Sequence, residues 1–147
     1  MSKALHQAFE TYLQKNDSRY TTQKKLIFTE ILKTKRHFEV EAFLNSLNKK
    51  NLSYSRATVY RTIKQLLDAH LIQKVSTQDG KVFYEPCKEQ KQHDHIICKD
   101  CGKIFEILEP NIETFLKTYC EHLNFDIEYR SLHVYGVCGD CKSKKQV

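Results

Sequence analysis

Four of the six cysteines form two pairs of identical spacing, Cys98/Cys101 and Cys138/Cys141. In a reducing compartment, paired cysteines are metal ligands or redox groups more often than disulfide partners. Two CxxC pairs can place four thiolates tetrahedrally around zinc, and their equal spacing favours one shared ion over a redox dithiol. Such a site has no open coordination position. We therefore predict a structural zinc whose binding energy contributes to folding.

A second group of possible metal ligands precedes the first cysteine pair. His93 and His95 are two residues apart, so on a strand both imidazoles project from one face and Asp94 from the other. They are either surface histidines or half of a metal site, which could be completed by Glu106, Glu85 or His37. Nitrogen and oxygen ligands suit Fe²⁺, Mn²⁺ or Zn²⁺. A site that draws on both halves of the chain would act as a metal-dependent switch.

The first half of the chain must position some of these ligands. Helical apolar spacing is present in four segments, with Thr21 or Thr22 as the expected cap of the second and Ser53 or Ser55 as that of the fourth. Two extended runs, 72–76 and 81–85, follow, joined by a strong hairpin turn signal, Asp79-Gly80. Helices followed by a hairpin predict a winged helix, whose last helix enters the DNA major groove.

The second half predicts a small α/β domain. Segments 93–98 and 103–108 alternate as strands around the first cysteine pair, and Pro110 opens a helix. Residues 125–137 alternate as one long strand that ends at the second pair, and the KSKK tail is expected to be solvated. The fold class is therefore α+β, with a winged helix over residues 1–87 and a metal-binding domain over 88–147.

The charge of the chain is unevenly distributed. Residues 1–86 carry 15 Lys and Arg against 8 Asp and Glu, whereas residues 87–147 carry 9 against 10. A basic first half suits a nucleic acid, although a solvated basic surface has the same composition. The sequence has no apolar run long enough to span a membrane and no signal-like N-terminus, so we expect a cytoplasmic protein. A metal-dependent enzyme and a zinc-stabilised interaction module are the alternatives of a different class.

Four segments in this order, RHFEVEAFLNSL, SRATVYRTIKQL, HDHIICKDCGKIFE and VYGVCGDC, resemble the ferric uptake regulator superfamily of metal-dependent repressors. The resemblance covers residues 15–142. It implies a structural zinc on the four paired cysteines and a regulatory metal on His37, Glu85, His93, His95 and Glu106. It also implies a recognition helix over 55–69, with DNA contacts from Arg19 in the minor groove and from Lys24, Arg56, Thr58, Tyr60, Arg61 and Lys64.

The resemblance further implies a homodimer on a palindromic double-stranded DNA operator, with 125–137 paired with its twin. Gln92 and Arg130 stand where many members have histidines, so a third site with Asp94 and Glu113 is not expected, and we predict two metals per subunit. Glu106 and Arg61 favour an iron-responsive regulator over a peroxide sensor, the second alternative. Zinc sensing is the third: Cys87 fits it, but Gln73 replaces the companion aspartate.

Overall fold

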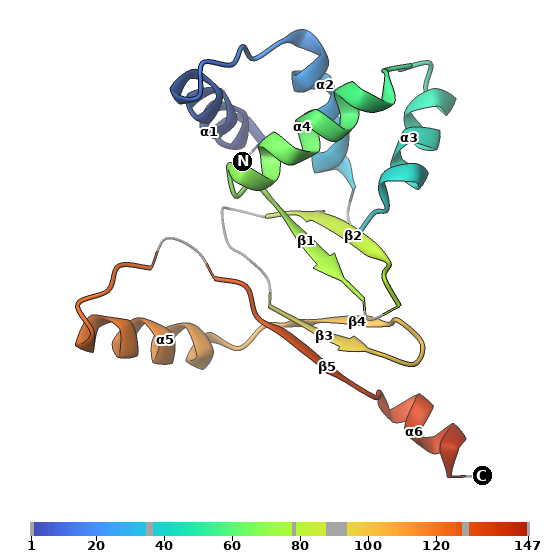
Figure 1. Cartoon of the computed structure of the whole chain (residues 1–147), viewed down its shortest axis with the longest axis vertical. Coiled ribbons are helices and arrows are strands. Elements are labelled where there is room, and N and C mark those ends of the chain that lie inside the picture. The colour runs from blue at the N-terminus through green and yellow to red at the C-terminus, as the bar shows by residue number, and fades with distance from the viewer. Residues whose placement is uncertain (1, 35–36, 78, 88–93, 128–129, 147) are drawn as a thin grey trace. The chain divides into compact units, whose positions relative to one another are not determined.

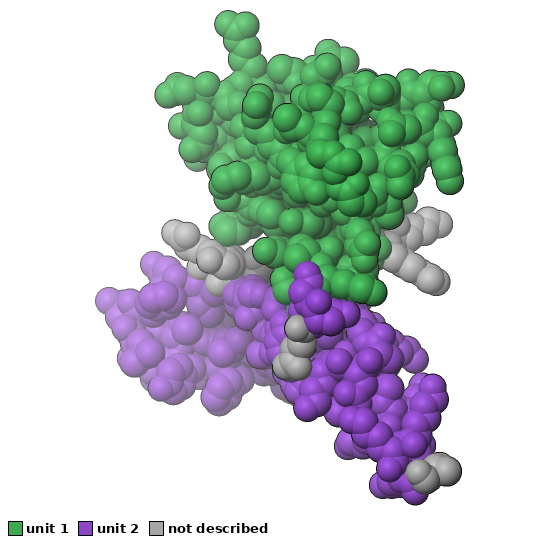
Figure 2. All heavy atoms as spheres, turned by 45° about the vertical axis from the view of Figure 1, so that its right-hand side comes forward, with its two compact units in different colours: residues 1–76, 81–91 green, residues 77–80, 92–147 purple. Residues whose placement is uncertain are grey.

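The computed structural model describes residues 2–34, 37–77, 79–87, 94–127 and 130–146 (Figure 1). The chain forms two compact units, residues 1–76 with 81–91 and residues 77–80 with 92–147 (Figure 2). The predicted α+β class is confirmed. Among the described residues, every helix is too short or too polar to cross a membrane.

The first unit contains four helices, α1 (Ser2–Lys15), α2 (Thr22–Lys33), α3 (Val40–Lys49) and α4 (Arg56–Asp68). Of the alternative caps, Thr21 accepts a hydrogen bond from the Lys24 backbone N–H and Ser55 from that of Thr58. The helices pack around one apolar core, to which each contributes fully or almost fully buried side chains, among them Phe9, Phe28, Leu47 and Ile63.

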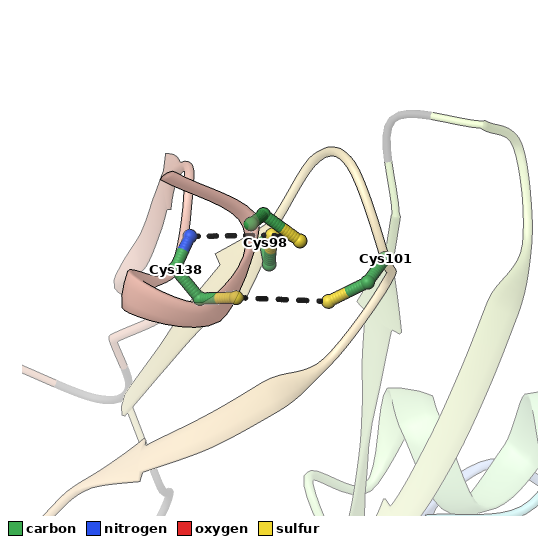
Figure 3. Close-up of side chains that lie close together, drawn as sticks. Cys98, Cys101 and Cys138 are labelled. Carbon is green, nitrogen blue, oxygen red and sulfur yellow. Dashed lines mark hydrogen bonds between the residues drawn. The ribbon is translucent and has the colours of Figure 1, made fainter. Parts of the chain in front are cut away.

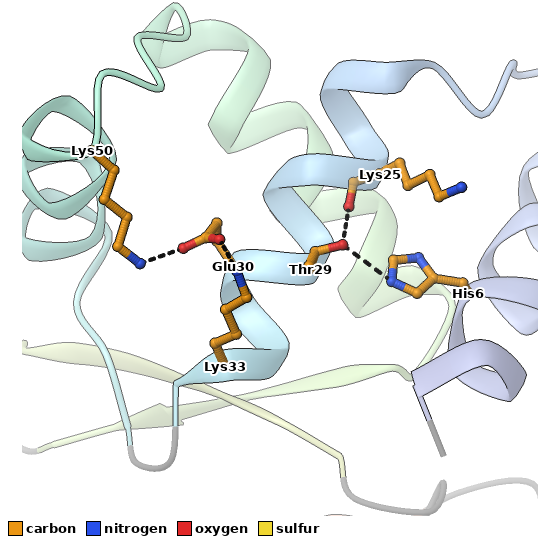
Figure 4. Close-up of polar contacts among 6 residues, drawn as sticks. All are labelled: His6, Lys25, Thr29, Glu30, Lys33 and Lys50. Carbon is orange, nitrogen blue, oxygen red and sulfur yellow. Dashed lines mark hydrogen bonds and ion pairs between the residues drawn. The ribbon is translucent and has the colours of Figure 1, made fainter.

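Polar contacts connect the helices at the edge of this core (Figure 4). The buried carboxylate of Glu30 on α2 forms ion pairs with Lys33 and with Lys50 after α3. His6 on α1 is half-buried and contacts Tyr20 and Thr29 through its two ring nitrogens. These contacts connect α1 to the loop before α2 and to α2 itself.

The helices are followed by the wing, an antiparallel hairpin of β1 (Ile72–Ser76) and β2 (Val82–Pro86). The predicted turn is present, and Gly80 has the positive φ of +84° that glycine tolerates best. Phe38 forms a β-bridge with Tyr84, with both backbone hydrogen bonds at 2.9 Å. This bridge holds the segment before α3 against β2 and thereby brings residue 37 next to residue 85.

The second unit is a three-stranded sheet of order β4-β3-β5 with two helices. β3 (Asp94–Cys98) pairs antiparallel with β4 (Ile104–Ile107) and parallel with β5 (His133–Gly136), while α5 spans Pro110–His122 and α6 spans Gly139–Lys145.

One prediction for this unit was wrong. Within 125–137, the described residues are extended in a ladder only over His133–Gly136, where β3 supplies the hydrogen-bonding partner. The lysine-rich tail is exposed to solvent as predicted, and it is helical, since α6 continues through the lysines after its N-cap Cys138.

Candidate metal centres and DNA-binding surface

The four paired cysteines converge at one end of the second unit's sheet (Figure 3). Their sulfur atoms all lie within 4.8 Å of one another, with Cys98 and Cys141 3.9 Å apart and Cys101 and Cys138 3.8 Å apart. A tetrahedron with zinc–sulfur bonds of about 2.3 Å has edges of about 3.8 Å. Two of the sulfur–sulfur distances therefore match the edges of a zinc tetrahedron, and all four sulfurs lie close enough together to share one ion.

Two short backbone motifs hold the sulfurs in place. Cys98 ends β3, and the turn to Cys101 closes with a 2.9 Å hydrogen bond from the Gly102 N–H to the Cys98 carbonyl. Cys138 is the N-cap of α6, which places Cys141 in the first helical turn. The Cys138 N–H donates to the Cys98 sulfur at 3.3 Å. The start of α6 is thus attached to the β3–β4 turn.

Contacts within the cluster also shift the pKa values of two of its thiols in opposite directions. Hydrogen bonds from the backbone of Cys101, and then of Cys138, lower the pKa of Cys98 to about 6. Hydrogen bonding to the Cys138 sulfur raises the pKa of Cys141 to about 12. Four thiolates are stable together only around a cation, so zinc binding here must release protons.

Two of the predicted regulatory ligands meet within the first unit. His37 Nε2 lies 2.8 Å from Glu85 Oε2, and the Glu85 side chain is 5% exposed. The other carboxylate oxygen accepts a hydrogen bond from the side chain of Gln73, which is the cross-strand partner of Glu85. Two cis ligands at about 2.1 Å from an octahedral metal are about 3.0 Å apart, so this pair is spaced for binding one ion.

Two other predicted ligands share one face of the second unit's sheet. His95 on β3 is fully buried, and Glu106 lies directly opposite it on β4. On its other side His95 is in register with His133 on β5, with ring centroids 5.7 Å apart. The prediction for His93 lies outside the described residues. The parallel pairing that brings in His133 has no local sequence signal, so sequence reasoning missed this neighbour.

Asp94 points to the opposite face from His95 and has a partner of its own. Its carboxylate, 3% exposed, pairs with Arg130 through Nη2–Oδ2 at 2.9 Å and Nε–Oδ1 at 3.4 Å. The guanidinium thus supplies the positive charge that this buried carboxylate needs, whereas Glu113 is exposed on α5.

Cys87, the possible zinc-sensor ligand, is buried directly after the wing. Burial, followed by the charge of Glu85, raises the pKa of its thiol to about 12. Its backbone N–H donates to Leu71 at 2.9 Å. Because the thiol stays protonated at neutral pH, Cys87 is poorly prepared for metal binding in this conformation.

The predicted DNA contacts lie in the first unit and on or near α4. Arg19, Arg56, Tyr60, Arg61 and Lys64 are exposed, whereas Lys24 and Thr58 are half-buried.

Sequence reasoning missed Glu41 on α3 in this region. Its carboxylate forms an ion pair with Arg56 and accepts a hydrogen bond from Tyr60 at 3.3 Å. The Glu41 carboxylate thus binds the side chains of two residues that are expected to contact DNA.

The chain matches the ferric uptake regulator family over residues 15–135. It is 30% identical over 143 residues to the ferric uptake regulation protein of Campylobacter jejuni, covering 96% of this chain and 90% of that protein. The ferric uptake regulator of Francisella tularensis, solved with iron, has a TM-score of 0.63 and 29% identity over 84% of this chain and 94% of that chain. The Helicobacter pylori regulator, described with three functional metal-binding sites, shares the fold: its TM-score is 0.73 at 22% identity, covering 97% and 94%.

Proposed function

Because the chain belongs to the ferric uptake regulator family, we propose that its homodimer represses genes by binding a palindromic DNA operator in the cytoplasm when iron is available. Membership makes the chain a metal-dependent transcriptional regulator of the iron type rather than an enzyme. The observation that carries the metal dependence is the His37–Glu85 pair, which joins two metal-ligating side chains inside the winged-helix unit.

Each unit carries part of the regulatory ligand set. The first supplies His37 and Glu85, and the second supplies His95 with Glu106. A divalent ion bound by both parts would cross-link the two units and so favour one orientation of the DNA-reading helix. Gln73 supports iron over zinc as the effector, because it donates to Glu85 and cannot serve as an anionic ligand.

An apolar surface on the second unit supports the homodimer. Ile96, Phe105 and Val134 are in register on adjacent strands, and each is about two-fifths exposed. None of the residues of α5 is buried, and Phe115 and Tyr119 are more than half exposed on it. Exposed apolar groups on two elements mark an interaction surface. A second copy would cover them and present two recognition helices to a two-fold operator.

The test is DNA binding by the full chain, with a labelled duplex selected from random sequence by the wild-type protein in Mn²⁺, an air-stable substitute for Fe²⁺. Wild-type binding should need the added metal. His95→Ala should no longer bind the duplex when metal is added, while it keeps its zinc and its dimer, and exposed His122→Ala should behave as wild type. Metal-independent binding by the wild type, or loss of zinc from His95→Ala, would refute the two-site switch.

A further inference from the structure

Lys24, one of the expected DNA contacts, forms hydrogen bonds within the protein. Its ammonium donates to the Ser18 hydroxyl at 2.8 Å and to the Arg19 carbonyl at 3.0 Å. The neighbouring Lys25 is exposed, whereas Lys24 is half-buried. Burial, and then the charge of Arg61, lower the pKa of Lys24. Two of its three ammonium protons are therefore used to hold the loop that carries Arg19.

The same loop is attached to the recognition helix. Ser18 also accepts a hydrogen bond from the side-chain amide of Gln65 on α4 at 3.2 Å. Gln65 follows Arg61 by four residues, so both lie on one stripe of α4. The Ser18 hydroxyl of the loop thus accepts hydrogen bonds from Lys24 on α2 and from Gln65 on α4, and so connects all three elements.

The rest of the loop is also fixed on both sides of Arg19. The Ser18 N–H donates to Leu13 at 2.8 Å, and the Tyr20 ring packs edge-on against Phe9 at 5.3 Å. Arg19 itself is exposed between these two anchored residues. Its backbone is held while its side chain is presented to solvent, which is the arrangement that a groove-reading side chain needs.

We propose that Lys24, Ser18 and Gln65 form a clamp that fixes Arg19 relative to α4, so that Lys24 is a positioning residue rather than a phosphate contact. The inference rests on the proposed DNA binding and on Arg19 contacting DNA. If Arg19 enters the minor groove while α4 enters the major groove, the distance between them must match the spacing of the two grooves. The clamp fixes that distance before DNA binds. Ser18 and Gln65 carry no charge, so the loss of either side chain should leave the salt slope of DNA binding unchanged.

The experiment is a double-mutant cycle, measured by fluorescence anisotropy with Mn²⁺-loaded full-length protein and the selected duplex. Lys24→Met and Ser18→Ala should each weaken binding about 5- to 10-fold, and neither should weaken it further once Arg19→Ala is present. Lys25→Met is the matched control, since it removes the same charge from the next, exposed position. Stoichiometric titration must give each variant the active fraction of the wild type, which excludes misfolding as the cause.

The salt dependence separates the two roles of Lys24. If Lys24 contacts a phosphate, Lys24→Met should still weaken binding in the Arg19→Ala background and should lower the salt slope there by about 1. That result, or wild-type affinity for Ser18→Ala or Arg19→Ala, would overturn the clamp while leaving the repressor function intact. Failure of the wild type to bind any duplex in metal would refute the proposed function itself.

Discussion

The ion pair between Asp94 and Arg130 yields a quantitative prediction about stability. Arg130→Ala should leave a carboxylate with 97% of its side-chain surface buried and no guanidinium within reach. Breaking a fully buried ion pair by removing one partner costs about 3–5 kcal/mol. Arg130 is 26% exposed, so water can partly replace it, and one of the two hydrogen bonds is long at 3.4 Å. We therefore expect a loss of about 2–3 kcal/mol, or roughly 30- to 150-fold in the unfolding equilibrium.

Urea unfolding followed by circular dichroism is the suitable assay, because the chain has no tryptophan to report by fluorescence. Protein and zinc concentrations must be held constant, since dimerisation and zinc binding both contribute to stability. Lys103→Ala is a matched control in the same unit. It removes an exposed partner 4.0 Å from Asp140 and should cost at most about 0.5 kcal/mol.

A second variant isolates the charge of the carboxylate. Asp94→Asn combined with Arg130→Ala should recover part of the loss, because no uncompensated charge stays buried. If Arg130→Ala were as stable as Lys103→Ala, or if the double variant were less stable than Arg130→Ala, the pair would not be the anchor that its geometry indicates.

Three further predictions concern the zinc site, the DNA-binding surface and pH. Cys101→Ser should release the structural zinc and dissociate the dimer, measured by elemental analysis and light scattering; a zinc-free dimer would contradict this. Glu41→Gln should tighten DNA binding several-fold by releasing Arg56 and Tyr60, and unchanged anisotropy titrations would argue against it. Burial, then Lys25, lowers the pKa of His6, so stability should fall as the pH drops below the unfolded value of 6.5 and level off once folded His6 is protonated. His6→Gln should flatten the pH dependence of the urea midpoint.

Local signals in the sequence were sufficient for the helix caps and the hairpin turn of the first unit. Thr21 and Ser55 precede apolar residues at helical spacing, and Asp79-Gly80 separates two extended runs, so the caps and the turn followed from neighbouring residues. The four-cysteine cluster was also predicted, because two CxxC pairs of identical spacing indicate one shared ion even when 36 residues separate them.

The errors came from features that depend on distant partners. Alternation over 125–137 indicated a strand, but Phe125 and Ile127 are exposed, and among the described residues of this segment a ladder exists only where β3 pairs with β5. Alternating apolar and polar residues indicate that one face of a segment is apolar. They do not indicate which strand or which copy of the chain packs against that face. Glu41 meets Tyr60 from 19 residues away, and Arg130 meets Asp94 from 36. No periodicity or spacing rule encodes such contacts.

Side chains alternate between the two faces of β3, so the four-cysteine site and the regulatory ligand His95 lie on opposite faces. Loss of the zinc site and loss of the regulatory site should therefore affect the protein differently. Asp94, Ile96 and Cys98 share one face, which serves the ion pair, the apolar surface and the zinc, while His95 belongs to the opposite face with Glu106. A zinc ion on the four cysteines would hold the ends of β3 and β5 together and so fix the strand that presents His95. Losing zinc should therefore abolish the metal response as well, whereas His95→Ala removes a ligand without disturbing the sulfurs. The dependence runs in one direction, from the structural site to the regulatory one.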